Sequence, residues 1–231
     1  MAKTKTKKPK KTAKQKWAIF GKVIMWIVIV IAIIAAVIAT MNAISVKSTN
    51  NFISTINAVE YDNQLKPAVD EKDGYYTFTT DKDFKVVQLS DVHIGAGFMS
   101  TKKDIMAANA VEAMVRAEKP DLVVVTGDIG YPVPFQSGTL NNKNAAKIFA
   151  NLMEKMGVYW CLTYGNHDTE AYSFFNRADI SKIYSNKEKY PHCLFQSGPE
   201  DVDGYGNYPI KVKNSAGKIT QVFFMIDSHS Y

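Results

Sequence analysis

The chain has 231 residues, of which 46% are hydrophobic, and its formal net charge at pH 7 is +6. This charge comes from an N-terminal arm, because residues 1–16 hold eight lysines and the rest of the chain has 20 basic (28 − 8) against 22 acidic side chains. A basic character confined to one arm excludes a general nucleic-acid-binding surface, so no nucleic acid is expected among the partners.

Residues 17–44 form an apolar segment, and no charge occurs between Val23 and Val46. About 20 apolar residues cross a bilayer as a helix, so this segment predicts one transmembrane helix with Trp17 and Trp26 as interfacial anchors. Because lysines before a first span stay cytoplasmic, the prediction is a single-pass cell-membrane protein whose C-terminal part is extracytoplasmic. The arm would also attract anionic membrane lipids. A cleaved signal peptide and a buried core helix remain alternatives.

Residues 45–72 are rich in Asn, Ser, Thr and Lys and are predicted to form a linker. The domain that follows, residues 73–231, alternates strand-like and helix-like segments. This alternation predicts an α/β domain in which right-handed βαβ crossovers build a mainly parallel sheet. The predicted strands are residues 75–80, 84–89, 122–125, 158–164, 208–212 and 220–227, and the predicted helices are residues 101–118, 144–156 and 173–185.

Three short polar motifs follow three successive strands at nearly equal intervals. Since parallel strands end at the same edge of a sheet, where α/β proteins bind ligands, these side chains should lie together. Carboxylate, imidazole and carboxamide donors without cysteine suit Mn, Zn or Fe and argue against a closed structural zinc site. Any one of these residues alone is as readily a turn or cap residue, but the ordered set favours a metal site. The motifs are Asp91-Val92-His93, Gly127-Asp128 and Gly165-Asn166-His167-Asp168.

The order D-x-H, G-D and G-N-H-D resembles that of the calcineurin-like metallophosphoesterase superfamily, over roughly residues 80–231. A later stretch, which runs from Gly198 through Tyr205 to Ser228, resembles the branch related to purple acid phosphatases. The resemblance implies a mixed β-sandwich flanked by helices, preceded here by the transmembrane helix. It also implies a metal-dependent phosphoric ester hydrolase that cleaves phosphate mono- or diesters.

The resemblance assigns the metal ligands. Two divalent or trivalent ions of Mn, Zn or Fe would share Asp128 as a bridging carboxylate. Asp91 and His93 would hold the first ion, and the carboxamide of Asn166 would bind the second. Such a pair of ions binds phosphate oxygens and lowers the pKa of a shared water. The expected partner is therefore a phosphoester substrate.

Further roles are implied for the neighbours of these ligands. By resemblance, His167 lies beside the substrate phosphate as the catalytic residue, with a further metal ligand or a hydrogen-bond donor behind the ligands as the alternative. Asp168 would orient the ligands from behind. Tyr131, Phe135 and Gln136 lie in the loop after the second motif, and we expect them to be substrate contacts or plain loop residues.

One part of the superfamily pattern has no counterpart in the chain. The superfamily supplies further metal ligands from a C-terminal G-H-x-H motif, whereas only His192 and His229 follow the third motif here. We expect the domain to be incomplete at its C-terminal end and this 231-residue chain to be nearly inactive by itself. The alternative is a non-catalytic, membrane-tethered relic or binding module of the same fold.

Overall fold

The computed structural model describes residues 11–229, so most of the basic arm, residues 1–10, lies outside the described residues. The chain divides into two compact units, one up to Thr40 and the other from Met41 onward. Helix α1 (Ala13–Ser54) contributes to both. It contains an 18-residue window with a mean hydropathy of 3.1 that is not buried, and it is long and apolar enough to cross a membrane.

Helix α1 extends beyond its predicted end at residue 44, so residues 45–54 of the predicted linker are helical, whereas residues 55–67 form no helix or strand. In the structure the helix continues to Ser54, with Ser45, Thr49 and Ile53 buried in the second unit. Positions four residues apart share one face of a helix, so this polar segment is the packed end of α1. Its polar side chains resembled a linker because their burial depends on contacts with distant parts of the chain.

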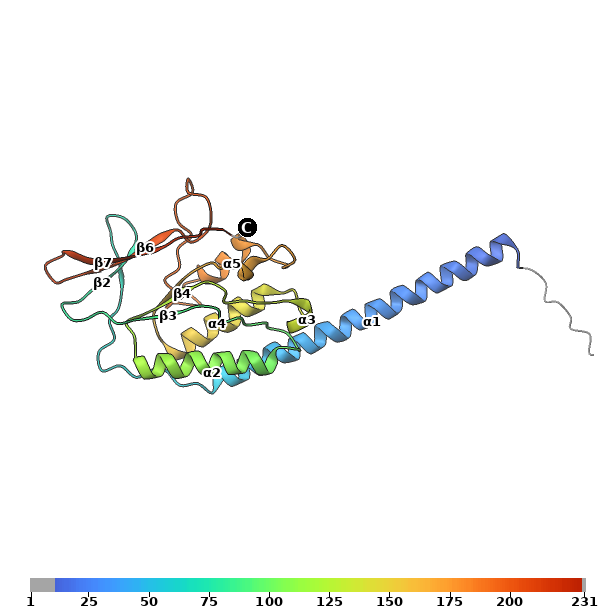
Figure 1. Cartoon of the computed structure of the whole chain (residues 1–231), viewed down its shortest axis with the longest axis horizontal. Helices are drawn as coiled ribbons and strands as arrows, with labels where there is room; N and C mark the ends of the chain where they lie inside the picture. The colour runs from blue at the N-terminus through green and yellow to red at the C-terminus, as the bar shows by residue number, and fades with distance from the viewer. Residues whose placement is uncertain (1–10, 230–231) are drawn as a thin grey trace, which may run out of the picture. The chain divides into compact units, whose positions relative to one another are not determined.

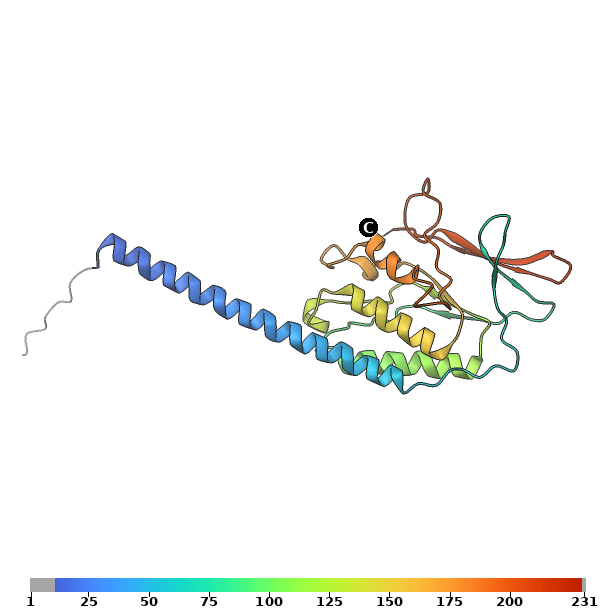
Figure 2. The same cartoon turned by 180° about the vertical axis from the view of Figure 1, so that it is seen from behind.

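The first sheet has three parallel strands in the order β3-β4-β5. Helices α2 and α4 connect the strands in sequence and lie on the same side of β3 and β4 (Figures 1 and 2). This arrangement agrees with the predicted βαβ units. The bounds are β3 (Val86–Leu89), α2 (Thr101–Glu118), β4 (Leu122–Thr126), α3 (Pro134–Ser137), α4 (Asn142–Met156), β5 (Trp160–Thr163), the 3-10 helix η1 (His167–Thr169) and α5 (Arg177–Tyr184).

The second sheet is mixed and has the strand order β1-β2-β6-β7. Strands β2 and β6 are parallel, whereas β6 and β7 form the antiparallel hairpin predicted from the sequence. The fold is therefore a mixed α/β arrangement of two sheets flanked by helices, as the sequence analysis predicted. The bounds are β1 (Ala68–Val69), β2 (Tyr76–Thr79), β6 (Tyr208–Lys213) and β7 (Ile219–Met225).

Tyr208 joins the two sheets. Its hydroxyl donates to the carbonyl of Leu162 at 2.8 Å and accepts from the same residue's N–H at 3.1 Å. Because Leu162 lies on β5, shortly before the third motif, this buried pair of hydrogen bonds fixes the second sheet close to the candidate ligands.

Candidate metal centre

The first two motifs leave their strands through sharp backbone turns. Asp91, His93 and Asp128 have φ angles of 56°, 53° and 55°. Residues other than glycine seldom adopt this left-handed region, and doing so costs free energy that the surrounding fold must supply. These three of the six non-glycine residues with positive φ among the described residues are candidate ligands, so strained backbone is present where the donor atoms converge.

The donor atoms of three residues lie close enough to hold one ion. One ligand atom from each of His93, Asp128 and His167 lies within 4.8 Å of the others. His93 Nε2 is also 3.6 Å from both Asp91 Oδ1 and Asp128 Oδ2. That separation is too long for a hydrogen bond, but it suits two ligands that each bind the same ion at about 2 Å.

The charge of Asp128 is not neutralised by the protein. This residue is only 9% exposed, and no lysine or arginine within residues 11–229 forms an ion pair with it or with Asp91. A buried carboxylate is costly unless it is paired or coordinates a metal. The uncompensated charge and the nearby imidazoles therefore fit a cation.

The third motif encloses the carboxylate of Asp128. The backbone N–H of His167 donates to Asp128 Oδ1 at 2.9 Å. A Cβ at Gly165 would lie 2.5 Å from the Asp128 nitrogen and 2.7 Å from its Cγ, so only glycine fits there. The loop can therefore approach Asp128 closely enough for its N–H to fix the direction of the carboxylate.

Asp168 connects the loops that carry the second and third motifs. Its Oδ2 accepts from the N–H groups of Asp128 (3.0 Å) and Gly165 (2.9 Å), and its Oδ1 accepts from that of Gly130 at 2.9 Å. Burial raises the pKa of Asp168 to about 6, against the opposing effect of these hydrogen bonds. One side chain thus holds the second and third motifs in register.

The ring of His167 is held on two sides. Its Nδ1 lies 2.7 Å from Glu170 Oε1, and its ring packs edge-to-face on Tyr131 with centroids 4.6 Å apart. Tyr131 also stacks on His93 at 4.8 Å. Because Nδ1 interacts with Glu170, the other ring nitrogen, Nε2, is the one available to bind a ligand or the substrate. The side chain of Asn166 forms no hydrogen bond with another residue of the described part of the chain.

Comparison with known proteins identifies this arrangement. The family model described as calcineurin-like phosphoesterase matches residues 84–228, which include all three motifs. The chain belongs to this family. The resemblance inferred from the three motifs is therefore confirmed, and the family typically binds divalent metals.

Curated relatives of the calcineurin-like domain include plant and yeast proteins. The chain is 30% identical to "Probable inactive purple acid phosphatase 14" of Arabidopsis thaliana, over 67% of the chain and 42% of the relative. It is 30% identical to "Phosphatase DCR2" of Saccharomyces cerevisiae, over 66% of the chain and 28% of the relative. The chain thus spans less than half the length of these relatives. No solved structure matches the chain.

The three predicted substrate contacts lie in different environments in the structure. Tyr131 lies against His93 and His167, as described above. Phe135 is 91% exposed and Gln136 is also exposed, and no hydrogen bond joins either side chain to the candidate ligands within residues 11–229. Both lie on the short helix α3, which directs them into solvent, so the structure does not bring them to the centre.

The two later histidines lie outside the donor group. His192 Nδ1 is 2.7 Å from Glu154 Oε2, and His229 Nε2 is 3.5 Å from Asp203 Oδ2. Glu170 was not among the predicted site residues, although its position three residues after His167 places both in one turn. This spacing was visible in the sequence and could have identified it.

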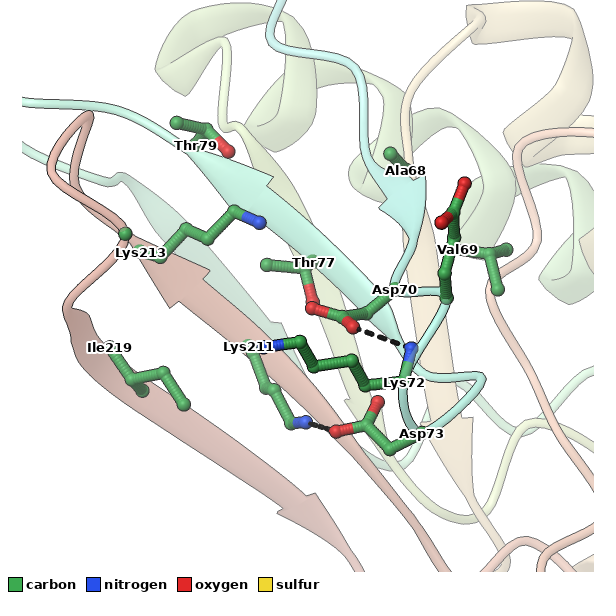
Figure 3. A pocket seen from close by; sticks show the side chains of 12 residues that line it. Ala68, Val69, Asp70, Lys72, Asp73, Thr77, Thr79, Lys211, Lys213 and Ile219 are labelled. Atoms are coloured by element: carbon green, nitrogen blue, oxygen red, sulfur yellow. Dashed lines mark hydrogen bonds and ion pairs between the residues drawn. The ribbon is translucent and has the colours of Figure 1, made fainter.

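A second concave surface lies on the β1-β2-β6-β7 sheet (Figure 3). Its lining includes Thr77, Lys211 and Lys213, and the ammonium of Lys211 pairs with Asp73. None of the candidate metal ligands lines this pocket. We therefore treat it as separate from the metal centre.

Proposed function

We propose that the protein is a membrane-anchored phosphoesterase that hydrolyses phosphate mono- or diesters with a dinuclear metal site in an extracytoplasmic domain. One observation carries the proposal: ligand atoms of His93 and His167 converge on the buried carboxylate of Asp128, which pairs with no lysine or arginine within residues 11–229. The family assignment supports the same chemistry.

Each side chain has a role in the proposed reaction. Asp128 would bridge the two ions, with Asp91 and His93 on one side and the carboxamide of Asn166 on the other. When bound, the ions would supply a water of lowered pKa and a clamp on the phosphate oxygens. His167, held by its backbone N–H and by its ring, would hydrogen-bond the phosphate or protonate the leaving oxygen.

Replacing Asp128 by asparagine tests the proposal. We expect Asp128→Asn to lose at least one ion per chain, because the neutral amide cannot hold two cations together, and to remove any turnover of nitrophenyl phosphate or bis-nitrophenyl phosphate that the wild-type chain shows. The measurements are metal content and initial rate of the purified full chain with Mn, Zn or Fe.

The matched control is Asp83→Asn, since Asp83 is exposed and precedes strand β3, whereas Asp91 follows it. Wild-type metal content and turnover in Asp128→Asn, with an unchanged control, would refute the bridging role.

A binding module without turnover is the second candidate function. It is favoured by the names of two relatives, the probable inactive purple acid phosphatases 14 and 29 of Arabidopsis thaliana. This second function predicts that the wild-type chain holds both ions and binds inorganic phosphate without hydrolysing either ester, whereas any metal-dependent turnover that Asp128→Asn removes would contradict it.

A further inference from the structure

The C-terminal part of α1 is hydrogen-bonded to the two loops that follow the first two metal motifs. The carboxamide of Asn42 accepts from the N–H of Phe98 at 2.9 Å and donates to the carbonyl of Gly138 at 3.0 Å. One turn later, the hydroxyl of Ser45 donates to the carbonyl of Gly97 at 2.8 Å. The polar side chains of this helix end therefore hold both loops together.

These contacts lie at the end of the apolar run, at the point where a helix that crosses a bilayer would leave it. Lys22 is the last charged residue before that run. At 1.5 Å per residue, about 20 residues cover a hydrocarbon core of about 30 Å. Counting from Lys22 ends the crossing near Asn42, and the next charge, the exposed Lys47, follows in the headgroup region. We therefore expect the two loops that are hydrogen-bonded to Asn42 to lie at the level of the bilayer surface.

Both loops present large apolar side chains to the outside. Met99 is 52% exposed and Phe135 is 91% exposed. The two loops also contact each other, because the N–H of Met99 donates to the carbonyl of Ser137 at 3.1 Å. Lys102 and Lys103 follow as exposed residues in the first turn of α2. Apolar tips beside lysines are the composition of a surface that enters the interface of an anionic bilayer.

The two loops pack closely against each other. Gly138 has a φ of +79°, and a Cβ there would lie 2.6 Å from Cδ1 of the Phe98 ring, so the ring packs directly on the glycine. The segment from Asp128 to Gly138 is short. A fixed position for Phe135 therefore also constrains Tyr131, the residue that contacts both imidazoles.

We propose that Met99 and Phe135 insert into the bilayer interface on the Asn42 side, with Lys102 and Lys103 on anionic lipid headgroups. The candidate centre is then held at the membrane surface, where its substrate would be a phosphoester carried by a lipid headgroup or held close to one. This inference rests on the membrane anchoring stated under the proposed function.

Site-directed nitroxide labels on the full chain test the inference. The chain is reconstituted in nanodiscs of phosphatidylcholine and phosphatidylglycerol, and accessibility to oxygen and to a nickel chelate is measured by electron paramagnetic resonance. The test labels are at Met99→Cys and Phe135→Cys. The native Cys161 and Cys193 are 0% exposed, and unlabelled wild-type chain provides the background.

Two control labels separate the possible failures. Ile31→Cys, in the middle of the apolar run, reports on anchoring, and Ser215→Cys, in the exposed turn between β6 and β7, reports the aqueous value. We expect the label at residue 31 to show high oxygen and low nickel accessibility. The labels at 99 and 135 should show clearly more oxygen and less nickel accessibility than the label at 215.

Each contrary result has its own meaning. If residue 31 is deep in the bilayer but residues 99 and 135 match residue 215, the docking surface is wrong while the anchor stands. If residue 31 is itself aqueous, the anchoring fails and the inference falls with it. If residues 99 and 135 are shielded from both reagents, a protein covers them, and the bilayer is the wrong partner.

Discussion

At the scale of single residues, the candidate centre depends on how closely two backbone segments approach each other. Gly165 lies against the nitrogen and carboxylate of Asp128, and a Cβ at Gly127 would lie 2.6 Å from the nitrogen of Gly165. One of the clashing partners in each case is backbone, so a change of side-chain rotamer cannot relieve the overlap.

We expect Gly165→Ala to move the third motif away from Asp128. Overpacking of this kind costs about 1–3 kcal/mol, which corresponds to a fall of roughly 2–10 °C in Tm for a chain of this size. Metal content should fall as well, because the N–H of His167 no longer orients the carboxylate. Thermal unfolding and metal analysis of the full chain in detergent check both effects.

Gly21→Ala is the matched control, since a Cβ at Gly21 meets no heavy atom within 4 Å. A Gly165→Ala variant with the Tm and metal content of this control would show that the close approach has no role in the site.

At the scale of elements, a buried ion pair joins the end of β7 to the start of α5. The guanidinium of Arg177 pairs with Asp227, and the two side chains are 10% and 0% exposed. Arg177 also donates to the carbonyl of Gly165 at 3.4 Å and to Thr169 Oγ1 at 3.2 Å. The pair therefore links the second sheet to the loop that carries the third motif.

The pKa of Asp227 has a direction that predicts a pH dependence. Burial alone raises this pKa, but hydrogen bonds from the N–H groups of Tyr205 and His229 and from Arg177 outweigh it and leave the pKa below its ordinary value of 3.8. A carboxyl group with a lowered folded-state pKa stabilises the fold above the ordinary pKa. This stabilisation is lost as the pH falls through the folded-state value.

We expect Asp227→Asn to lower the free energy of unfolding by about 3 kcal/mol at pH 7, because it leaves the buried charge of Arg177 unpaired. The difference from wild type should stay constant down to about pH 5 and shrink below the ordinary pKa. Urea unfolding of the full chain in detergent at several pH values measures it. Asp201→Asn, at an exposed loop position, is the control, and an equal loss in both variants would contradict the role of the pair.

The elements also show which features the sequence could predict. Local patterns sufficed for β3, β4 and β5, because each is an apolar run that ends in a polar motif. They did not suffice for the parallel pairing of β2 with β6, which brings together Thr77 and Lys211, or for the burial of Thr49 on α1. Both depend on contacts between distant parts of the chain.

At the scale of the whole molecule, the proposed topology follows from the distribution of lysines. Eight precede the apolar run within residues 1–16, and Lys47 is the first charge after it. Positive charge before a first span retains that end in the cytoplasm.

We expect alkaline phosphatase fused after Tyr231 to be active and green fluorescent protein fused there to be dark, because the proposed topology places the C-terminal unit outside the cytoplasm. Green fluorescent protein fused before Met1 should fluoresce. Replacing the eight arm lysines by glutamine should weaken this asymmetry. The opposite pattern of reporter activity would reverse the topology.

The left-handed turns at Asp91, His93 and Asp128 have a consequence for the lifetime of the protein. Such residues cost on the order of 1–3 kcal/mol each, with aspartate at the lower end because it tolerates this region. Their sum is a substantial share of the roughly 5–15 kcal/mol that stabilises a typical domain. A cation bound to the same side chains would favour the folded state by mass action. Supply of metal would then set how long each molecule survives degradation, so that scarcity of the ion would reduce the number of molecules as well as their activity.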